Sequence, residues 1–308
     1  MKRFLLQICL FFILMIGVDQ LSGWGFNWLS EHAKGGYVAH HNYILENTKE
    51  DILIFGSSRA IHHYNPEIIT DSTGLTCYNC GQDGNGIVLF DGWWDIINDR
   101  HRPKAIIYDL TPSFDILKGE DNHKYLGWLK EEYDHPGVKE IFKAVDETEQ
   151  IKMQSKMYRF NSKFLQLIAD NVHPIFAIEG NGFLPLKGAI DPMKVDKNHK
   201  VNNDFVVDSL KLSLLDDFIQ DSNGTKLYFV ISPLWYGHSP DLISYLNQFC
   251  QERSIQFYDY SNNPKYLHHN EYFKDGSHLN EYGANEFTKE IIGEIKKDLT
   301  MNNVRETK

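Results

Sequence analysis

The stretch ILIFGSSR, residues 52–59, predicts the fold of this chain. Its first four residues form an apolar run typical of a buried parallel strand, and Gly56 ends the run. Ser57 and Ser58 follow at once, where the carboxyl end of such a strand meets the edge of its sheet. Open α/β folds place their functional sites at this edge, so the stretch predicts an α/β domain with a hydroxyl side chain at its site.

Strand-like and helix-like segments alternate along the rest of the chain. Two helix starts carry a polar cap followed by proline, at Asn65-Pro66 and at Ser239-Pro240. We expect strands at 51–55, 75–79, 104–110, 226–231 and 255–258, and helices at 86–100, 204–221 and 279–299. Five strands joined by helices predict a mostly parallel sheet covered on both faces, which is a three-layer α/β/α sandwich.

The regular alternation stops at Thr111. Residues 111–203 hold polar helical stretches at 138–145 and 158–172, followed by a loop rich in glycine and proline. We interpret this region as a helical insertion after strand three that caps or lines the site. The α/β domain then covers 51–299, residues 19–50 form a lead-in without clear periodicity, and 300–308 form a polar tail.

Composition limits the classes of partner. The chain has 308 residues, of which 42% are hydrophobic, enough for one large domain with a core or for a domain with an insertion. The formal net charge is −11, and no basic cluster is dense enough to neutralise phosphates, so a nucleic-acid partner is not expected.

The N-terminus resembles an export signal. Lys2 and Arg3 precede a nearly continuous apolar segment that ends at Val18, which is short for a membrane span and long enough for a signal-peptide core. Asp19 follows without an Ala-x-Ala cleavage site, so we favour an uncleaved signal anchor (1–18) over a cleaved signal peptide. The rest of the chain would then lie in the cell envelope, on the extracytoplasmic (periplasmic) side, anchored to the inner membrane or, after cleavage, secreted.

The cysteines do not form a strong motif. Cys77 and Cys80 form a C-x-x-C pair, which a disulfide would join in an oxidising compartment. The pair ends a strand instead of opening a helix, so a thioredoxin-like redox role is not expected. One such pair also offers too few ligands for a zinc site. Buried thiols are the interpretation we favour. Adjacent histidines point in different directions and no carboxylate or cysteine completes a ligand set, so we predict no metal and no cofactor at the three histidine pairs, at 40–41, 62–63 and 268–269.

A second motif lies near the other end of the chain. The sequence DGSHLN, residues 275–280, places Asp275 three residues before His278. A serine hydroxyl needs a base within hydrogen-bond distance, and an aspartate on a tight turn can orient the imidazole of that base. We therefore predict Ser58 as nucleophile, His278 as base and Asp275 as orienting group, with Ser58 Oγ about 2.6–3.5 Å from a ring nitrogen of His278.

The loop after the second strand offers backbone donors. Residues 78–86, YNCGQDGNG, lead into a helix, and their glycines allow the backbone to approach a substrate. The loop lacks the lysine of a Walker motif and the spacing of a dinucleotide fingerprint, so nucleotide binding is not expected.

These three blocks together resemble the SGNH/GDSL hydrolase superfamily. The resemblance covers about 50–115 and 225–295, and implies a flavodoxin-like sandwich in which the backbone N–H groups of Ser58 and Gly84 form an oxyanion hole. Ser57 stands where the family usually has aspartate. The Gly-Ser-Ser-Arg block and the anchor also resemble envelope members that move acyl groups on cell-surface polymers, such as the D-alanyl transfer protein of teichoic acid assembly and the alginate acetylation proteins.

One block departs from the family pattern. The edge after strand three reads DLTPSFD, residues 109–115, without the asparagine that completes the family's oxyanion hole. Thr111 or Ser113 would have to donate instead. Loss of one such donor typically lowers the rate by about 10²–10³, which is compatible with a slow transferase or with a protein that has no catalysis.

Four further side chains are candidates for substrate binding. Arg59 would pair with an acidic or phosphorylated substrate or with a structural carboxylate, and Asn79 belongs to the second family block. Trp235 and Tyr236, in a loop, would stack on sugar rings or pack in the core, whereas Trp93-Trp94 in a helix is expected in the core.

Three functions remain open on the sequence. An esterase would transfer an acyl group from a saccharide or envelope polymer to water, and an acyltransferase would pass it to a sugar hydroxyl with the help of a membrane acyl-donor protein. The third is a non-catalytic carbohydrate-binding or envelope-assembly protein on the same fold.

Overall fold

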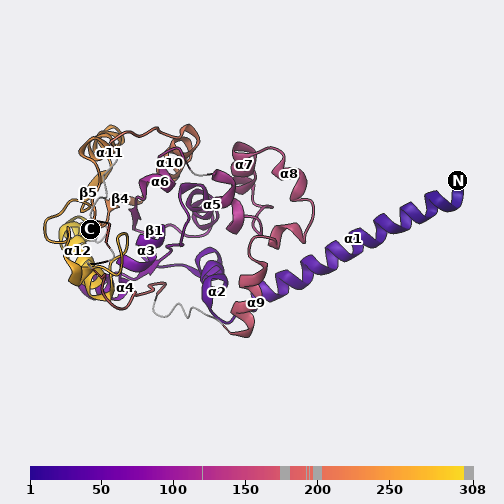
Figure 1. Ribbon diagram of the computed structural model, residues 1–308, viewed down its shortest axis with the longest axis horizontal. Coiled ribbons are helices and arrows are strands. Elements are labelled where there is room, and N and C mark those ends of the chain that lie inside the picture. The colour runs from indigo at the N-terminus through magenta and orange to yellow at the C-terminus, as the bar shows by residue number, and fades with distance from the viewer. Residues whose placement is uncertain (120, 174–180, 192, 194, 197–202, 302–308) are drawn as a thin grey trace, which may run out of the picture. The chain divides into compact units, whose positions relative to one another are not determined.

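The computed structural model describes the chain except for residues 120, 174–180, 192, 194, 197–202 and 302–308. It divides into two compact units (Figure 1). The smaller unit consists of Met1–Asn47 and Asp121–Ala177, and the larger of Thr48–Glu120 and Ile178–Lys308. Residues 302–308, which make up most of the predicted polar tail, lie outside the described residues.

A five-stranded, all-parallel sheet forms the centre of the larger unit. The strand order is β2-β1-β3-β4-β5, with β1 in an interior position beside β3. The strands are β1 (Ile52–Gly56), β2 (Cys77–Asn79), β3 (Ala105–Asp109), β4 (Lys226–Ile231) and β5 (Gln256–Asp259). All five predicted strands are present, and the prediction of a parallel sheet is confirmed.

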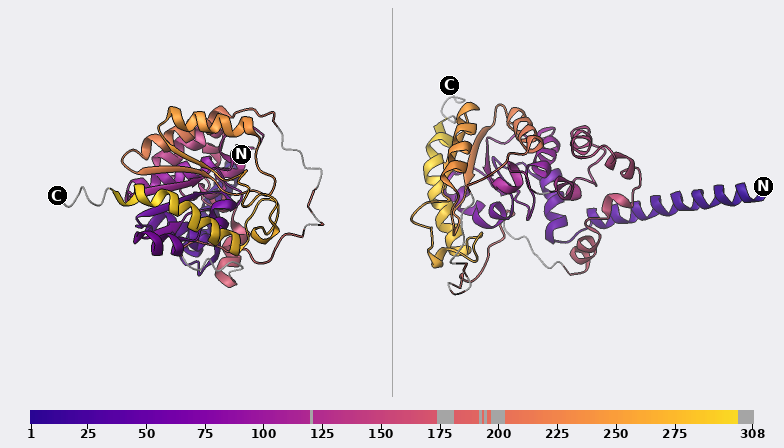
Figure 2. Two further views of the ribbon diagram at one scale, coloured as in Figure 1. Left: turned by 90° about the vertical axis from the view of Figure 1, so that its left-hand side faces the viewer. Right: turned by 45° about the horizontal axis from the view of Figure 1, so that its top comes forward.

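Alternate side chains of each strand enter two separate packing layers. Ile52 and Ile54 of β1 lie in one hydrophobic cluster with residues of α12 (Glu281–Met301), including Phe287. Phe55, on the opposite face, contacts the rings of Trp94 in α5 (Ile87–Asn98) and Phe218 in α10 (Ser209–Asp221). Helices thus cover both faces of the sheet (Figure 2), and the three-layer α/β/α sandwich is confirmed.

Two further helices of the larger unit, α4 and α11, begin where their capping residues predict. Asn65 caps α4 and Ser239 caps α11, each accepting a hydrogen bond from a backbone N–H in the first turn. The bounds are α3 (Ser58–His63), α4 (Pro66–Thr73), α6 (Pro112–Asp115), α11 (Pro240–Glu252) and the 3₁₀ turn η4 (Asn270–Tyr272).

The helix expected from 204 begins later than predicted. Asp208 accepts hydrogen bonds from the N–H groups of Leu210 and Lys211, and this cap sets the start of α10 at Ser209. The residue before the cap, Val207, instead forms an isolated antiparallel bridge with Leu117. Trp93 and Trp94 of α5 are fully buried, as predicted.

The smaller unit is helical. Its elements are α1 (Lys2–Glu31), α2 (Gly36–Asn42), the π-helix η1 (Tyr43–Asn47), η2 (Asn122–Trp128), α7 (Pro136–Val145), α8 (Glu149–Lys152), η3 (Tyr158–Phe160) and α9 (Phe164–Val172). The stretch 158–172, expected as one helix, is interrupted between η3 and α9.

The N-terminal helix continues well beyond the end of the apolar segment from which it was predicted. The helix α1 does not stop at Val18 but runs to Glu31, so much of the expected lead-in at 19–50 is helical. Asp19 does not end the helix because its carboxylate accepts hydrogen bonds from the backbone N–H groups of Lys156 and Met157. By length and composition α1 is long and apolar enough to cross a membrane.

The expected insertion at 111–203 is divided between the two units. Residues 121–177 belong to the smaller unit, whereas α6 and the described residues between 181 and 207 belong to the larger one. Gly180, in the predicted Gly/Pro-rich loop, lies outside the described residues.

Candidate active site

Ser58 lies at the carboxyl edge of the sheet because the chain turns sharply after β1. Gly56 adopts φ of +138°, and a Cβ atom there would approach the backbone oxygen of Asp109 to 2.6 Å. Only glycine fits this turn, which leads through Ser57 into α3 with Ser58 as its first residue. Ser57 is buried, whereas the Ser58 hydroxyl faces a cavity.

The three predicted catalytic side chains are connected by hydrogen bonds. Ser58 Oγ lies 2.8 Å from His278 Nε2, within the predicted range. His278 Nδ1 lies 3.0 Å from each carboxylate oxygen of Asp275. A carboxylate only accepts, so Nδ1 carries the proton and Nε2 is left to accept from the hydroxyl. Partial burial acts to raise the pKa of Asp275, but hydrogen bonds from His278 and from the N–H of Ser277 outweigh it and lower the pKa to about 2.

A buried histidine joins the two segments that carry these side chains. His63, at the end of α3, accepts a hydrogen bond at Nε2 from the backbone N–H of Leu279, at 2.9 Å. Its Nδ1 donates to Ser232 Oγ at the end of β4, at 2.8 Å. Burial, with the neighbouring charges of His278 and Arg59, holds the pKa of His63 well below its usual range, so the ring is neutral. His63 therefore fixes the backbone next to His278 to the helix that begins with Ser58.

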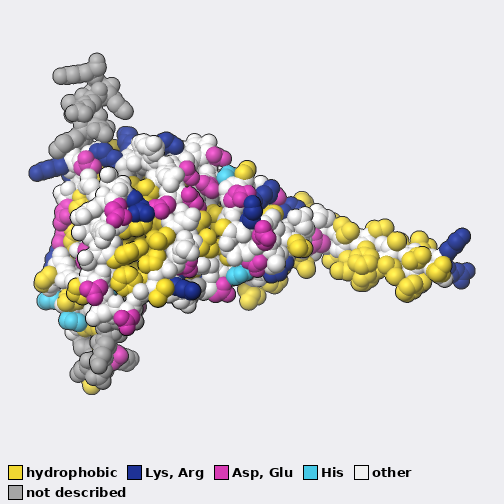
Figure 3. Space-filling model, turned by 90° about the horizontal axis from the view of Figure 1, so that it is seen from above, with side chains coloured by type: hydrophobic (Ala, Val, Ile, Leu, Met, Phe, Trp, Pro, Cys, Tyr) yellow, Lys and Arg dark blue, Asp and Glu magenta, His cyan; other side chains and the backbone are white. Residues whose placement is uncertain are grey.

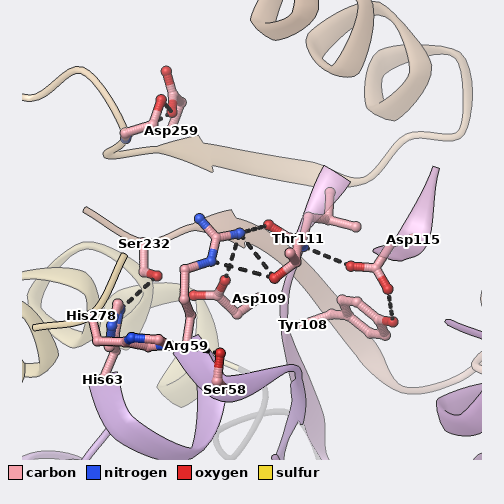
Figure 4. Close-up of polar contacts among 12 residues, drawn as sticks. Ser58, Arg59, His63, Tyr108, Asp109, Thr111, Asp115, Ser232, Asp259 and His278 are labelled. Atoms are coloured by element: carbon pink, nitrogen blue, oxygen red, sulfur yellow. Dashed lines mark hydrogen bonds and ion pairs between the residues drawn. The ribbon is translucent and has the colours of Figure 1, made fainter. Parts of the chain in front are cut away.

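Arg59 points away from Ser58 into a buried polar network (Figure 4). Its Nη2 lies 3.4 Å from Asp109 Oδ1, and the guanidinium also donates to Thr111 Oγ1 and to the backbone oxygen of Leu110. The expected structural ion pair is therefore present. Burial raises the pKa of Asp109, although Arg59 acts against that shift.

The same network continues to a second buried carboxylate. Asp115 accepts from the N–H of Thr111 at 2.6 Å and contacts the hydroxyl of Tyr108 at 2.9 Å. Burial raises the pKa of Asp115 to about 7, against the lowering effect of these hydrogen bonds and of Arg59 and Lys211.

A cavity of about 590 Å³ opens beside Ser58. Its wall includes Ser58, Arg59 and His278, and it takes a largely apolar lining from Phe114, Phe205 and Leu234. Tyr236 and Ser113, both predicted as substrate-binding residues, also line this cavity.

Two predicted binding residues have structural roles instead. Asn79 is fully buried; its amide donates to the backbone oxygens of Ala60 and Tyr64, and its oxygen accepts from the N–H of Gly81. Trp235 is only 5% exposed and packs edge-on against Phe273 in the core. Neither residue lines the cavity. The prediction of Asn79 as a binding residue is thereby corrected, and of the two alternatives for Trp235 the structure shows packing in the core.

Of the two predicted oxyanion donors, Ser58 lines the cavity and Gly84 does not. The backbone N–H of Ser58 opens α3 and has no acceptor within the described part of the chain. Gly84 lies at an exposed turn with φ of +66° and is not part of the cavity wall. Thr111 Oγ1, one of the suggested replacements, accepts from Arg59.

The sulfur and histidine groups occupy ordinary structural positions. Cys77 and Cys80 are free, buried thiols whose pKa burial raises well above its usual range. Two groups in the smaller unit have the residue types of a metal site, but a lysine pairs with a carboxylate in each. In the first group, His41 with Glu131 and Glu132, Lys163 pairs with Glu131. In the second, His123 with Asp146 and Glu149, Lys152 pairs with Glu149.

Comparisons with known proteins add little to this geometry. No protein-family model matches the chain, and no curated protein matches it. One solved structure that it resembles is described as "putative platelet activating factor from Streptococcus pneumonia", with 15% sequence identity and a TM-score of 0.38. The alignment covers 92% of this chain and 99% of the other. A likeness at this level carries no statement about activity, so function has to be argued from the site.

Proposed function

We propose that this chain is an extracytoplasmic serine ester hydrolase or O-acyltransferase of the SGNH/GDSL type. The observation that carries the proposal is the 2.8 Å separation of Ser58 Oγ and His278 Nε2, with Asp275 on the other ring nitrogen. Two segments 220 residues apart in the sequence supply this pair. A hydroxyl, an imidazole and a carboxylate in this order are the groups that acyl transfer through a serine requires.

The reaction follows from the orientation of the three groups. Ser58 Oγ attacks the acyl carbonyl while its proton passes to His278 Nε2, and Asp275 stabilises the resulting imidazolium. His278 then returns the proton to the departing alcohol oxygen, which leaves an acyl group on Ser58. Water or a sugar hydroxyl, deprotonated by His278, attacks this ester and releases the acyl group, restoring Ser58. No cofactor takes part in these steps.

Stabilisation of the oxyanion is the weak part of the site. We assign it to the backbone N–H groups of Ser58 and Gly84, as the family resemblance implies, and the segment 109–115 at the end of β3 has no asparagine to add a third donor. Gly84 would have to approach from its exposed turn. Slow hydrolysis in water, with faster transfer to a bound acceptor, is the behaviour that we expect.

The cavity favours a substrate with both apolar and polar parts. Phe114, Phe205 and Leu234 suit an acyl group or the apolar face of a sugar, and Tyr236 offers a ring for stacking. We therefore propose an esterified saccharide or cell-envelope polymer as substrate. The helix α1 would hold the chain at the membrane, where an acyl-donor protein is a proposed partner of the transferase form.

A fluorophosphonate probe tests the proposal directly, because it reacts only with an activated serine. The purified full chain in detergent is expected to be labelled on Ser58 and to hydrolyse p-nitrophenyl acetate slowly, and Ser58→Ala is expected to lose both properties. Ser57→Ala is a matched control, since Ser57 is adjacent, buried and without a hydrogen-bond partner for its hydroxyl.

The outcomes separate the alternatives. Labelling with weak hydrolysis, and turnover that rises when a sugar acceptor is added, supports the transferase form. Absence of labelling, together with saccharide binding that Ser58→Ala leaves unchanged, would show a non-catalytic binding or assembly protein on this fold.

A further inference from the structure

One helix of the smaller unit has apolar side chains on its outward face. In α9, Leu167 is buried, and Phe164, Leu165, Ile168 and Val172 are between 40% and 78% exposed. At 100° per residue these four lie within an arc of about 100° on the side that faces away from the unit. A surface helix in water normally carries polar residues there, so this face is made for contact with an apolar environment.

Exposed apolar side chains are concentrated in this part of the chain. After the end of α1, nine large hydrophobic residues are exposed within the described residues, and six of them lie between Ile151 and Val172. They include Ile151 at 76% and Met157 at 48%, which also line a hollow of about 660 Å³. Phe26 of α1 forms part of the same hollow, so the exposed region is continuous with α1.

The length of α1 indicates what covers this surface. Apolar side chains cover α1 up to the basic residues near its free end (Figure 3). The apolar segment from Phe4 to Val18 rises only about 22 Å as a helix, whereas the hydrocarbon layer of a bilayer is about 30 Å thick. With Lys2 and Arg3 at the cytoplasmic surface, Asp19 therefore lies below the far edge of the hydrocarbon layer.

Asp19 is the residue that joins α1 to the turn at 155–157. Its carboxylate accepts from the N–H groups of Lys156 and Met157, at 2.9 and 3.1 Å, and from the Ser155 hydroxyl. A Cβ atom on Gly23 would meet the Cβ of Lys156 at 2.3 Å, so the two segments are in close contact one turn further along. The turn is thus held at the depth where α1 is still inside the bilayer. The next turns of α1 carry Trp24 and Trp28, which are 72% and 49% exposed, and tryptophan is typical of the membrane interface.

We infer that the region from Ile151 to Val172, together with the exposed face of α1 up to Trp28, is a lipid-binding surface that sits in the outer leaflet of the membrane. The apolar face of α9 lies at the boundary of headgroups and acyl chains, and acyl chains fill the hollow beside Phe26. This surface lies beside the part of α1 that follows the continuous apolar segment, which by itself is shorter than the hydrocarbon layer is thick. The inference rests on the insertion of α1 and is independent of the chemistry proposed for Ser58.

Photolabelling of the unmodified protein tests this inference. The full chain is placed in nanodiscs of phosphatidylcholine that contain a phospholipid with a diazirine on its acyl chain, irradiated, digested and mapped by mass spectrometry. We expect adducts on α1 and on peptides from 151–172, and none on α7, which serves as an internal control in the same unit. Adducts on α1 without any on 151–172 would overturn the inference, and absence of adducts on α1 as well would overturn membrane insertion itself.

Single fluorescent labels give a second measurement. In a Cys9→Ser background, whose other described cysteines are buried, an NBD probe is attached at Leu165→Cys or at the matched polar control Glu140→Cys. In liposomes with nitroxide-labelled phosphatidylcholine, the probe at 165 is expected to lose most of its emission and the probe at 140 to keep it. Equal quenching at both positions contradicts the inference. Quenching of the probe at 165 by aqueous iodide alone also contradicts it, and would indicate that this face binds a protein partner instead of lipid. Fluorophosphonate labelling of Ser58 in the same samples reports the proposed function separately.

Discussion

The two units differ in the unusual residues that they bury and expose. The larger unit buries charged and polar side chains, among them Arg59, His63 and Asp109, each at most 4% exposed. The smaller unit exposes apolar side chains, among them Leu165 and Val172, each 78% exposed. Both arrangements cost free energy in a protein that only had to fold in water.

The difference indicates two separate demands on the sequence. Buried polar groups in the larger unit are hydrogen-bonded to one another and hold the backbone around Ser58 and His278, so they serve positioning. Exposed apolar groups in the smaller unit have few protein contacts, so they serve an environment outside the chain. Substitutions in each set test whether it has the role that its location suggests.

The largest effect is expected from removal of His278, the proposed base. His278→Ala should lower kcat/KM for an ester substrate by about 10⁴-fold or more, because no other group would accept the Ser58 proton. His62→Ala is the matched control, since its ring lies 5.5 Å from that of His278 and bonds instead to Leu184 O and Asp83. A loss within about tenfold is expected for the control, and equal losses in both variants would contradict the assignment of the base.

A large effect on stability is expected at Asp115. Its pKa is about 7 in the folded protein and 3.8 ordinarily, so between these values the folded state holds a proton that the unfolded chain releases. The free energy of unfolding therefore falls as the pH rises from about 4 to 7, by about 4 kcal/mol for a shift of about three pKa units, and is level above that.

Asp115→Asn tests this pH dependence because an amide imitates the protonated carboxyl. Its oxygen can accept from Thr111 and its NH₂ can donate to Tyr108, so the variant should lose most of the fall in stability. Urea unfolding in detergent at several pH values measures the difference. The exposed Asp71→Asn is the control, and a variant at position 115 that follows the wild-type curve would show that this carboxylate stays ionised when buried.

The sequence predicts elements best where local signals fix both ends. The bounds of β4 agree with the prediction because Gly224 precedes the apolar run and Pro233 follows it. The length of α1 could not be predicted, because Asp19 resembles the end of an apolar segment and most of the hydrogen bonds to its carboxylate come from the distant turn at 155–157.

The site shows the same limit. The proximity of Ser58, Asp275 and His278 could be predicted because their motifs lie at expected edges of the sheet. Asn79 was assigned to binding because its backbone partners on and after α3 are not visible in the sequence. The sequence gives His63 no role beyond its place in an adjacent histidine pair at which no metal is predicted, since nothing local signals a bond to Leu279.

A contrast in stability is expected within α9. Leu167→Ala should weaken the smaller unit by about 3 kcal/mol, because Leu167 is fully buried with Val38 and Phe160. Leu165→Ala should change stability in detergent by less than about 0.5 kcal/mol, because it is on the outward face. Hydrogen exchange of the amides of α2 and α9 measures both, and a large loss for Leu165→Ala would show that this face is part of the core.

The smallest effect expected is on the position of the base. His63→Leu removes the acceptor for the Leu279 N–H and the donor to Ser232, so the segment that carries His278 should lose its fixed position relative to Ser58. We expect kcat to fall by about 10- to 100-fold with KM little changed, and fluorophosphonate labelling of Ser58 to slow in parallel.

His63→Gln separates positioning from general stability. Its amide oxygen can accept from the Leu279 N–H, so the variant should recover much of the labelling rate even though it fills the buried site less well than the ring does. If both variants lose stability but label Ser58 at the wild-type rate, His63 supports the core and not the base. Recovery with glutamine but not with leucine would instead tie the buried polar network of the larger unit to the chemistry at its edge, because glutamine can restore the hydrogen bond to Leu279 and leucine cannot.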